Sequence, residues 1–417
     1  MTASTRDDPP NTAIFSDNPE KRSDHAQPRH PGKLKAVQTV RSLRMSTSST
    51  PAVGYTPPKG EWERRDPDTQ GFDPVALSEA LKFAEATEID WPKDLHDRAP
   101  KGENHTNDRV LGPLKVRSAP AGLVIRGGYI VGEYGDPSSV EVTFSCTKSY
   151  IGTLAGQAVD RDLIHSMDDR VSGYIKDGGF DSDHNSKITW RHLLQQTNEW
   201  EGELFGLPDT VDRGRVVGGS ASMNGGTDNS ALPHQEPGTF WEYNDVRVNR
   251  TALSLLRIYD EPLPAVLKRN VMDPIGASDG WEWHGYETSM VDLNGEQVES
   301  VSGGAHWGGG LWIDTFDHAR FGLLYSRRGR WNDKQIVSES WVYAMTEPCS
   351  IKPEYGYLWW LNHEGEISDL ASSRSFAARG AGGNVVFIDP VSDVVIVVRW
   401  CNDPKAVIDR ILGTLAK

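Results

Sequence analysis

The sequence has few cysteines, no long hydrophobic run and no excess of positive charge. Its three cysteines, Cys146, Cys349 and Cys401, are too few and too scattered for a disulfide framework or a zinc ligand set, which favours reduced thiols. No apolar stretch approaches the length of a membrane span, and the polar first ten residues, with Asp7 and Asp8, precede no apolar core of a signal peptide. We therefore expect a cytoplasmic protein.

The charge and the missing motifs narrow the range of partners. A net charge of −15 over 417 residues opposes binding to nucleic acid or to an anionic membrane as a main activity. The twelve histidines show no HExxH or comparable ligand spacing, and no P-loop or GxGxxG pattern follows an expected strand. We therefore expect neither a metal nor a cofactor.

Four segments of the chain differ in composition. Residues 1–60 are rich in Ser, Thr, Pro, Asp and Arg and lack a sustained apolar period, which predicts a flexible leader. Residues 61–160 and 301–417 mix strand-like and helical patterns, which predicts two halves of one mostly antiparallel sheet lobe. Residues 161–300 are helical and rich in loops, which predicts a mainly α-helical lobe inserted between these halves. The expected fold class is α+β.

Local patterns predict the individual elements. Residues around Gly127-Gly128 alternate as in a β-hairpin over 121–134. An apolar run from Phe144 to Ala155 predicts a helix after that hairpin. Further helices are expected over 75–86, 188–194, 246–259, 316–328 and 406–415, and strands over 355–360, 384–388 and 394–400.

The tetrad Ser145-Cys146-Thr147-Lys148 lies where the helix after the hairpin begins. Ser145 and Lys148 are three residues apart, so their side chains share one helix face and the amine can serve the hydroxyl as a base. A chain of this length contains about one SxxK by chance, so the neighbouring motifs must carry the interpretation.

Two later stretches could complete a site around this tetrad. Tyr243, in Tyr243-Asn244-Asp245, could pass a proton between nucleophile and leaving group if it lies beside a cation; the alternative is a buried core tyrosine. The small-residue run from Ala378 to Asn384 leads into a strand. Its backbone N–H groups and that of Ser145 could form an oxyanion hole, and the alternative is a glycine-rich turn.

In this order, the three motifs resemble those of the penicillin-recognising serine hydrolases. The chain is similar in particular to the branch that holds class C β-lactamases, β-lactamase-fold carboxylesterases and 6-aminohexanoate-dimer hydrolase. The similarity runs from about residue 65 to the end and includes the stretches 190–197, 308–322 and 355–360. It implies a β-lactamase-like or penicillin-binding-protein-like fold, with an antiparallel sheet flanked by helices and an inserted α-helical lobe.

The same resemblance implies roles for individual residues. Ser145 would be the nucleophile, Lys148 its base and Tyr243 the proton relay. The N–H groups of Ser145 and Ala381 would form the oxyanion hole.

The chain also departs from the family pattern. Where β-lactamases carry Lys-Thr-Gly on the late strand, this chain has Ala378-Arg379-Gly380, so the cation that receives a β-lactam carboxylate is absent from that position. Antibiotic hydrolysis is therefore the less favoured branch. Asp245 stands where many relatives have Asn, which changes the local charge but still allows a hydrogen bond to the lysine.

Five further residues are substrate-contact candidates by position alone. Trp200 and Trp307 could wall an apolar cleft, and Glu201, His306 and Gly380 could touch a substrate. The alternative for each is a core or loop residue without a role in binding.

A rival nucleophile motif is less favoured. The stretch Gly276 to Gly280 matches GxSxG, but Pro274 and a helix precede it, whereas a nucleophile elbow follows a strand. We therefore do not expect Ser278 to be a nucleophile.

These features predict a serine hydrolase that cleaves small linear amides or esters through an acyl-enzyme. The alternatives are a β-lactamase or D-amino-acid carboxypeptidase and, in a different class, a non-catalytic binding module on the same fold. The joint presence of Ser145, Lys148 and Tyr243 argues against the binding module. The expected partner is a small-molecule amide or ester, and the oligomeric state stays open, with a homodimer as one alternative.

Overall fold

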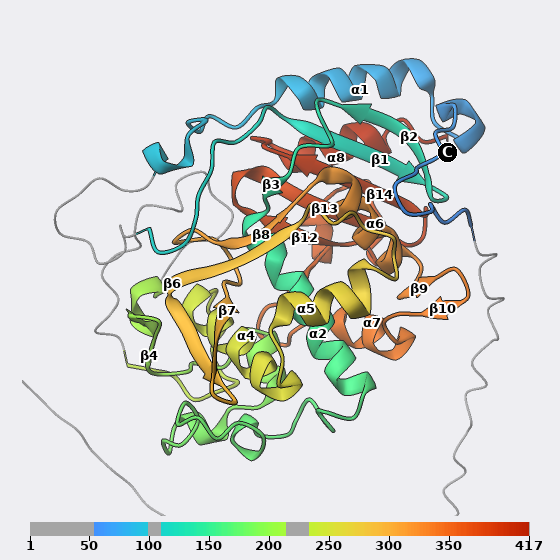
Figure 1. Ribbon diagram of the computed structural model, residues 1–417. Helices are drawn as coiled ribbons and strands as arrows, with labels where there is room; N and C mark the ends of the chain where they lie inside the picture. The colour runs from blue at the N-terminus through green and yellow to red at the C-terminus, as the bar shows by residue number, and fades with distance from the viewer. Residues whose placement is uncertain (1–53, 99–109, 214–232, 417) are drawn as a thin grey trace, which may run out of the picture. The chain divides into compact units, whose positions relative to one another are not determined.

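The structure is a computed structural model that describes residues 54–98, 110–213 and 233–416 (Figure 1). Residues 1–53 of the expected leader therefore lie outside the described residues. The described end of the leader, residues 54–60, contacts helix α6 (Thr315–Ser326). There the Arg320 guanidinium donates hydrogen bonds to the carbonyl oxygens of Pro57 and Pro58. Residues 54–60 are thus packed against the globular part.

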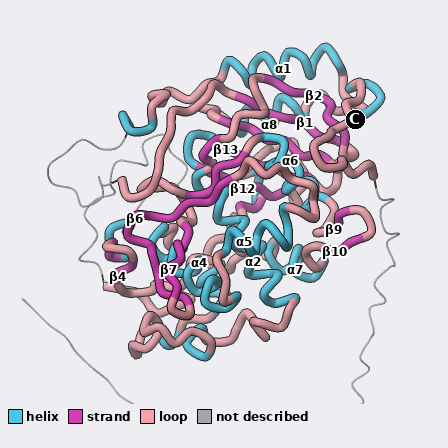
Figure 2. Tube along the Cα trace, in the orientation of Figure 1, coloured by secondary structure: helices cyan, strands magenta, loops and turns pink. Residues whose placement is uncertain are grey.

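A six-stranded antiparallel sheet has the strand order β11-β12-β13-β14-β1-β2 (Figures 1 and 2). The predicted hairpin β1–β2 is confirmed, and it turns at Gly127 and Gly128 with φ angles of 61° and 89°. Ala121 of β1 pairs with Arg399 of β14, which joins the early hairpin to the C-terminal strands. The strands are β1 Ala121–Arg126, β2 Tyr129–Tyr134, β11 Trp360–Leu361, β12 Phe376–Gly380, β13 Asn384–Asp389 and β14 Val394–Arg399.

Helices cover both faces of this sheet, so β13 and β14 are buried along their whole length. Helix α6 packs on β1, β13 and β14, and Gly322 allows a close approach because a Cβ there would lie 2.6 Å from Val395. Helices α1 (Pro74–Ala86) and α8 (Pro404–Leu412) pack together, α1 over β2 and α8 over β13 (Figure 1). The expected antiparallel sheet flanked by helices is confirmed.

A second antiparallel sheet has the order β3-β8-β6-β7. Its strands are β3 Glu141–Val142, β6 Glu282–Leu293, β7 Glu296–Val301 and β8 Gly310–Ile313. The hairpin β6–β7 falls within the segment 161–300, for which the sequence patterns indicated helices and loops. Asn294 and Gly295 form its turn, both with positive φ.

The expected helices are confirmed to within a few residues, but the strand expected over 355–360 is wrong. Only its last residue lies in β11; Leu358 has a φ of 60°, and its N–H donates to the Leu194 carbonyl, so the chain turns there. The remaining elements are α2 Thr147–Asp160, α3 Trp190–Leu194, α4 Asp245–Tyr259, α5 Leu263–Leu267, α7 Glu339–Met345, the π-helical turn η7 Lys268–Met272, and the short strands β4 Glu203–Leu204, β5 Leu207–Pro208, β9 Arg330–Trp331 and β10 Lys334–Gln335.

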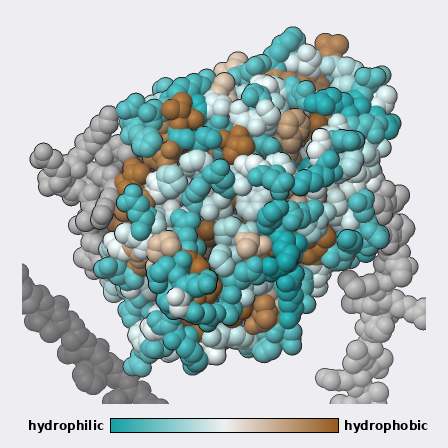
Figure 3. Space-filling model, in the orientation of Figure 1, coloured by the Kyte–Doolittle hydropathy of each residue, from teal (hydrophilic) through white to brown (hydrophobic). Residues whose placement is uncertain are grey.

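Within the described ranges, no helix is long and apolar enough to cross a membrane. The face shown in Figure 3 is mainly hydrophilic, with apolar side chains in small separate patches.

Candidate active site

The turn that carries Ser145 has an uncommon backbone conformation. The 3-10 turn η3 (Phe144–Cys146) leads directly into α2, and Phe144 has a φ of 48°, in the left-handed region. Its ring packs edge-to-face against Trp91 and Trp400, at centroid distances of 5.8 and 6.1 Å. This packing offsets the backbone strain and fixes Ser145 where α2 begins.

A buried imidazole also supports this turn. His318 Nε2 lies 2.5 Å from the Thr143 hydroxyl, and its Nδ1 lies 3.0 Å from the Tyr150 hydroxyl. Burial lowers the pKa of His318 well below its usual range, and the charge of Arg399 lowers it further. A neutral ring donates one hydrogen bond and accepts one, which suits these two hydroxyl partners. Thr143, two residues before Ser145, is thereby held in place.

Lys148 contacts the predicted nucleophile. Its Nζ lies 2.8 Å from Ser145 Oγ, and its side chain is almost fully buried on the first turn of α2. The same Nζ lies 2.5 Å from Asp245 Oδ1 and 3.4 Å from the Gly303 carbonyl oxygen. The structure thus brings hydroxyl, amine and carboxylate into one chain of contacts.

Asp245 belongs to a buried acidic group at the start of α4. Its backbone N–H donates to Asp212 Oδ2 at 2.6 Å, and His306 Nδ1 lies 3.9 Å from a carboxylate oxygen of each aspartate. Asp212, Asp245 and His306 are the one set with metal-ligand spacing found in the described ranges. Lys148 Nζ already contacts Asp245 Oδ1 at 2.5 Å, so one oxygen of this set has a partner in the chain.

Asn244 and Asp245 point to different partners. Asn244 caps α4 by accepting a hydrogen bond from the Arg247 N–H at 3.1 Å and donates to the Asp209 carbonyl at 2.7 Å. The Arg247 guanidinium in turn pairs with Glu199 and Asp209, at 2.6 and 3.1 Å. Asn244 therefore caps the helix, whereas Asp245 faces Lys148.

Tyr243 borders the lysine through its ring. The Lys148 Nζ lies 4.8 Å from the ring centroid, within the range of a cation–π contact. The ring is buried and packs against Tyr355 and Trp360 at centroid distances of 6.2 and 5.8 Å. The structure therefore places the ring of Tyr243 beside Lys148 Nζ.

The end of strand β12 approaches the nucleophile closely. A Cβ on Gly380 would lie 2.3 Å from the Thr143 carbonyl oxygen and 3.2 Å from the Ser145 nitrogen, so this approach requires glycine. Ala381 follows at the exposed edge, and its carbonyl accepts a hydrogen bond from the Asn384 side chain at 2.7 Å. The backbone of Gly380 and Ala381 therefore lies close to that of Ser145, as two sides of one oxyanion hole would have to.

A buried arginine ties this edge to the nucleophile turn. Arg399 Nε donates to Asn384 Oδ1 at 2.8 Å, and its Nη2 donates to the Val142 carbonyl at 3.3 Å. The Asn384 side chain in turn donates to the Ala381 carbonyl. Arg399 therefore connects the Ala381 edge to the segment that leads into Ser145, which are the two sides of the predicted oxyanion hole. Burial lowers the pKa of Arg399, but an arginine side chain stays charged near pH 7.

The other nucleophile candidates are occupied or neutral. Burial raises the pKa of the Cys146 thiol, beside Ser145, to about 11, so the thiol is neutral near pH 7. Ser278 of the GxSxG stretch donates its hydroxyl to Asp317 at 2.7 Å and caps a turn there.

The five substrate-contact candidates divide into two groups. Gly380 and His306 lie at the site, and Trp307 is buried against the His306 ring at a centroid distance of 4.2 Å. Trp200 instead donates its indole N–H to the Gly179 carbonyl, and Glu201 accepts from the Ser182 hydroxyl. None of the contacts described for Trp200 and Glu201 joins them to Ser145, Lys148 or Tyr243.

Four residues at the site were not found by sequence reasoning: Asp212, Gly303, Asn384 and Arg399. Only Asn384 had a local signal, because it directly follows the glycine run. The other three come from distant segments that the fold brings together.

The sequence profile of the Beta-lactamase family matches residues 122–412, about two thirds of the chain. The chain belongs to this family. The match spans the SxxK tetrad, the Tyr243 motif and the Gly380 edge, and the resemblance inferred from these motifs is confirmed. The beta-lactamase family consists generally of hydrolytic serine enzymes.

Solved structures of this fold resemble the chain at low identity. A D-stereospecific amidohydrolase from Streptomyces sp. has a TM-score of 0.52 and 16% identity, over 81% of this chain and 97% of that one. A family VIII carboxylesterase has a TM-score of 0.53 and 14% identity, over 82% and 96%. A protein from Bacillus anthracis assigned as a 6-aminohexanoate-dimer hydrolase has a TM-score of 0.48 and 19% identity, over 86% and 96%. A search of curated proteins finds no match.

Proposed function

We propose that this member of the beta-lactamase family is a serine hydrolase that cleaves small linear amides or esters through an acyl-enzyme. The observation that carries the proposal is the distance of 2.8 Å between Lys148 Nζ and Ser145 Oγ, at a helix start bordered by a glycine strand end. The hydroxyl has an amine within proton-transfer reach, and the strand end brings the backbone of Gly380 close to the Ser145 nitrogen.

In the acylation step, Ser145 Oγ attacks the substrate carbonyl carbon and its proton passes to the Lys148 amine. Asp245, at 2.5 Å, stabilises the ammonium that this transfer creates. Tyr243 relays a proton to the leaving amine or alcohol as the bond to the acyl group breaks. The acyl group is then bound to Ser145 as an ester.

Backbone N–H groups would stabilise the charge that develops on the carbonyl oxygen. Those of Ser145 and Ala381 come from the two segments that Gly380 brings together. In deacylation, water attacks the ester carbonyl and gives a proton to the Lys148–Tyr243 pair. The serine oxygen leaves and regains a proton, and a carboxylic acid is released.

Linear substrates are favoured over β-lactams by the surroundings of Arg379. Its guanidinium pairs with Glu366 at 3.0 Å and lies 5.2 Å from the Trp360 ring centroid. The cation next to Gly380 is thus paired with a carboxylate of the chain, which a β-lactam carboxylate would have to displace. The fold of the amidohydrolase and the carboxylesterase is compatible with either amide or ester cleavage.

The experiment is intact-mass spectrometry after exposure to a fluorophosphonate probe and, separately, a p-nitrophenyl acyl ester. Wild type is compared with Ser145→Ala and with Ser278→Ala, which removes the hydroxyl of the rival motif. We expect an adduct on wild type and Ser278→Ala, none on Ser145→Ala, and a loss of ester kcat of at least ~10³-fold in Ser145→Ala.

Three results would contradict the proposal. An adduct that persists in Ser145→Ala would place the nucleophile elsewhere. The absence of both adduct and ester turnover in wild type would favour the non-catalytic binding module. Faster acylation by a β-lactam than by any linear amide or ester would favour the β-lactamase or carboxypeptidase alternative.

A further inference from the structure

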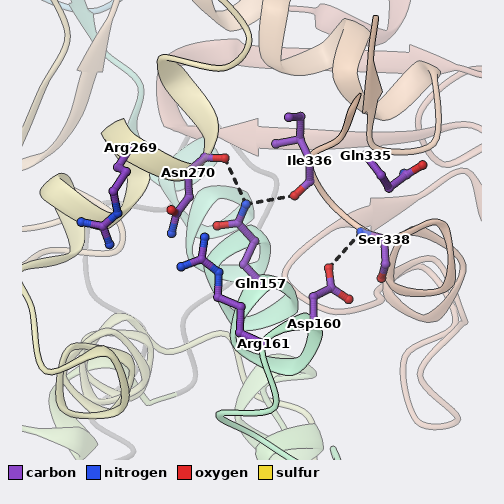
Figure 4. A pocket seen from close by; sticks show the side chains of 8 residues that line it. All are labelled: Gln157, Asp160, Arg161, Arg269, Asn270, Gln335, Ile336 and Ser338. Carbon is purple, nitrogen blue, oxygen red and sulfur yellow. Dashed lines mark hydrogen bonds between the residues drawn. The ribbon is translucent and has the colours of Figure 1, made fainter. Parts of the chain in front are cut away.

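A pocket lies at the opposite end of α2 from Ser145. It has a volume of about 500 Å³ and lies between the end of α2, the turn η7 and the loop before α7. Gln157, at its base, is nine residues beyond Lys148, which is about 13 Å along the helix axis. We call it the α2 C-terminal pocket; its lining residues are Gln157, Asp160, Arg161, Arg269, Asn270, Gln335, Ile336 and Ser338 (Figure 4).

Two buried carboxamides at its base have unused hydrogen-bonding groups. Gln157 and Asn270 are only 3% and 8% exposed. Gln157 Nε2 donates to the carbonyl oxygens of Asn270 and Ile336, at 3.2 and 3.1 Å, which fixes the orientation of the amide. Gln157 Oε1 and Asn270 Nδ2 then have no partner among the described residues. Buried polar atoms are rarely left in this state, so the base of the pocket offers one acceptor and one donor to an additional molecule.

The rim carries one cation and one anion without an ion pair. Arg269 is neutralised by Glu261, with two contacts of 2.6 and 2.7 Å. Arg161 is exposed, and within the described ranges its guanidinium has no hydrogen bond or ion pair. The Asp160 carboxylate accepts a backbone hydrogen bond from Ser338 at 2.9 Å and, in the same ranges, pairs with no cation. Figure 4 shows Gln157 between Arg161 and Asp160, with Asn270 on the Arg161 side.

We propose that the α2 C-terminal pocket binds a small amino carboxylate, a molecule with an ammonium at one end and a carboxylate at the other. The carboxylate would accept hydrogen bonds from the planar guanidinium of Arg161 and from Asn270 Nδ2. The ammonium would lie against Asp160, on the other side of Gln157 from Arg161 (Figure 4). This arrangement gives a partner to Arg161, Asp160 and Asn270 Nδ2.

The chemical class also connects this pocket to the proposed reaction. Hydrolysis of a linear amide built from amino acids releases amino carboxylates, so in this respect the inference rests on the proposed function. The pocket itself contains no residue of the active site. A molecule bound there would contact the last turn of the helix whose first turn carries Lys148.

The test is isothermal titration calorimetry of Ser145→Ala, which cannot form an acyl-enzyme, with 6-aminohexanoate. Hexanoate and hexylamine serve as ligands that lack one charged end. We expect saturable binding of 6-aminohexanoate, weaker by at least tenfold after Arg161→Ala or Asp160→Asn. Arg161→Lys should retain part of the affinity, because it keeps the charge but loses the planar pair of donors.

Arg64→Ala is the matched control, because it also removes one exposed arginine charge but lies outside the pocket. Its affinity for 6-aminohexanoate should equal that of the parent. The proposal is overturned if 6-aminohexanoate shows no saturable binding, if Arg161→Ala binds it unchanged, or if hexanoate binds equally well. These outcomes leave the adduct experiment on Ser145 unaffected, so failure of the pocket and failure of the proposed function can be told apart.

Discussion

Two buried charge clusters meet at the start of α4, and they use different cations. In one, Lys148 Nζ contacts Asp245 and the Ser145 hydroxyl. In the other, Arg247 pairs with Glu199 and Asp209. An arginine stays charged and holds several acceptors with fixed geometry, whereas a lysine can release its proton. The permanently charged Arg247 therefore lies where α4 is held to its neighbours. Lys148, which can give and take a proton, lies where the reaction is proposed.

Lys148→Arg should break this contrast most strongly. The guanidinium can still face Asp245, but it cannot take the Ser145 proton, so ester kcat/KM should fall by ~10²–10⁴-fold. Steady-state kinetics with a p-nitrophenyl ester measure the effect. Lys59→Arg, at an exposed pair with Asp279, is the control and should be unchanged. Retained activity in Lys148→Arg would show that Lys148 does not act as the base.

Arg247→Met tests the other cluster. It removes the buried cation shared by Glu199, Asp209 and Glu242, of which Glu199 keeps Arg213 and Asp209 keeps His234. The free energy of unfolding should therefore fall by ~3–5 kcal/mol. Urea denaturation measures this change, and the kcat of the folded fraction should stay close to wild type. Arg64→Met removes an exposed pair with Glu133 and should cost no more than ~1 kcal/mol. A stable but inactive Arg247→Met protein would mean that this cluster acts in the reaction.

Asp245→Asn sharpens the comparison without removing a contact. The amide cannot stabilise the ammonium that the acylation step creates on Lys148, so ester kcat should fall by ~10–10²-fold. Steady-state kinetics with a p-nitrophenyl ester check this. Asp273→Asn, at an exposed pair with Lys268, should leave kcat unchanged. An unchanged kcat in Asp245→Asn would exclude the carboxylate from stabilising the transferred proton.

A smaller effect is expected for a partly buried carboxylate that faces another carboxylate. Burial and the neighbouring Asp317 raise the pKa of Asp314 from 3.8 to about 7. Between these values the folded protein keeps a proton that the unfolded chain has lost, so this group makes stability fall as pH rises from about 4 to 7. Asp314→Asn keeps an oxygen for the Asp317 N–H that caps α6 and should remove up to ~1.4 kcal/mol per pH unit of that slope. Urea midpoints measured across this range decide it; an identical slope in both proteins would contradict the assignment.

Much of the fold could be predicted because its signals are local. The hairpin of β1 and β2 has its paired glycines, and the long helices have their apolar period. The β6–β7 hairpin also had a signal, Asn294-Gly295, but its strands are only partly buried and rich in polar residues, so no apolar alternation surrounded the turn. The strand expected over 355–360 failed because Leu358 turns the chain through a tertiary contact, and aromatic composition alone does not reveal such a contact.

The candidate site divides along similar lines. Ser145, Lys148 and Tyr243 belong to motifs with recognisable spacing, so the sequence indicated them together. Arg399 is 254 residues from Ser145 and belongs to no motif, and its role depends on bonds to Asn384 and Val142 that only the folded chain forms. Trp200 and Glu201 were chosen for their position after a family-like stretch, but their described contacts serve the local structure of that segment.

The pairing of β1 with β14 has a consequence for how the protein is made. Ala121 and Arg399 are neighbours in the sheet but 278 residues apart in the chain. During synthesis the β1–β2 hairpin therefore leaves the ribosome before β14 exists, so one edge of β1 stays unpaired while nearly three hundred further residues are made. Contacts of such separation form slowly, so the edge of β1 is exposed to aggregation in that interval. We expect the yield of folded protein in a cell to depend on chaperones that bind this hairpin more than on the stability of the finished sheet.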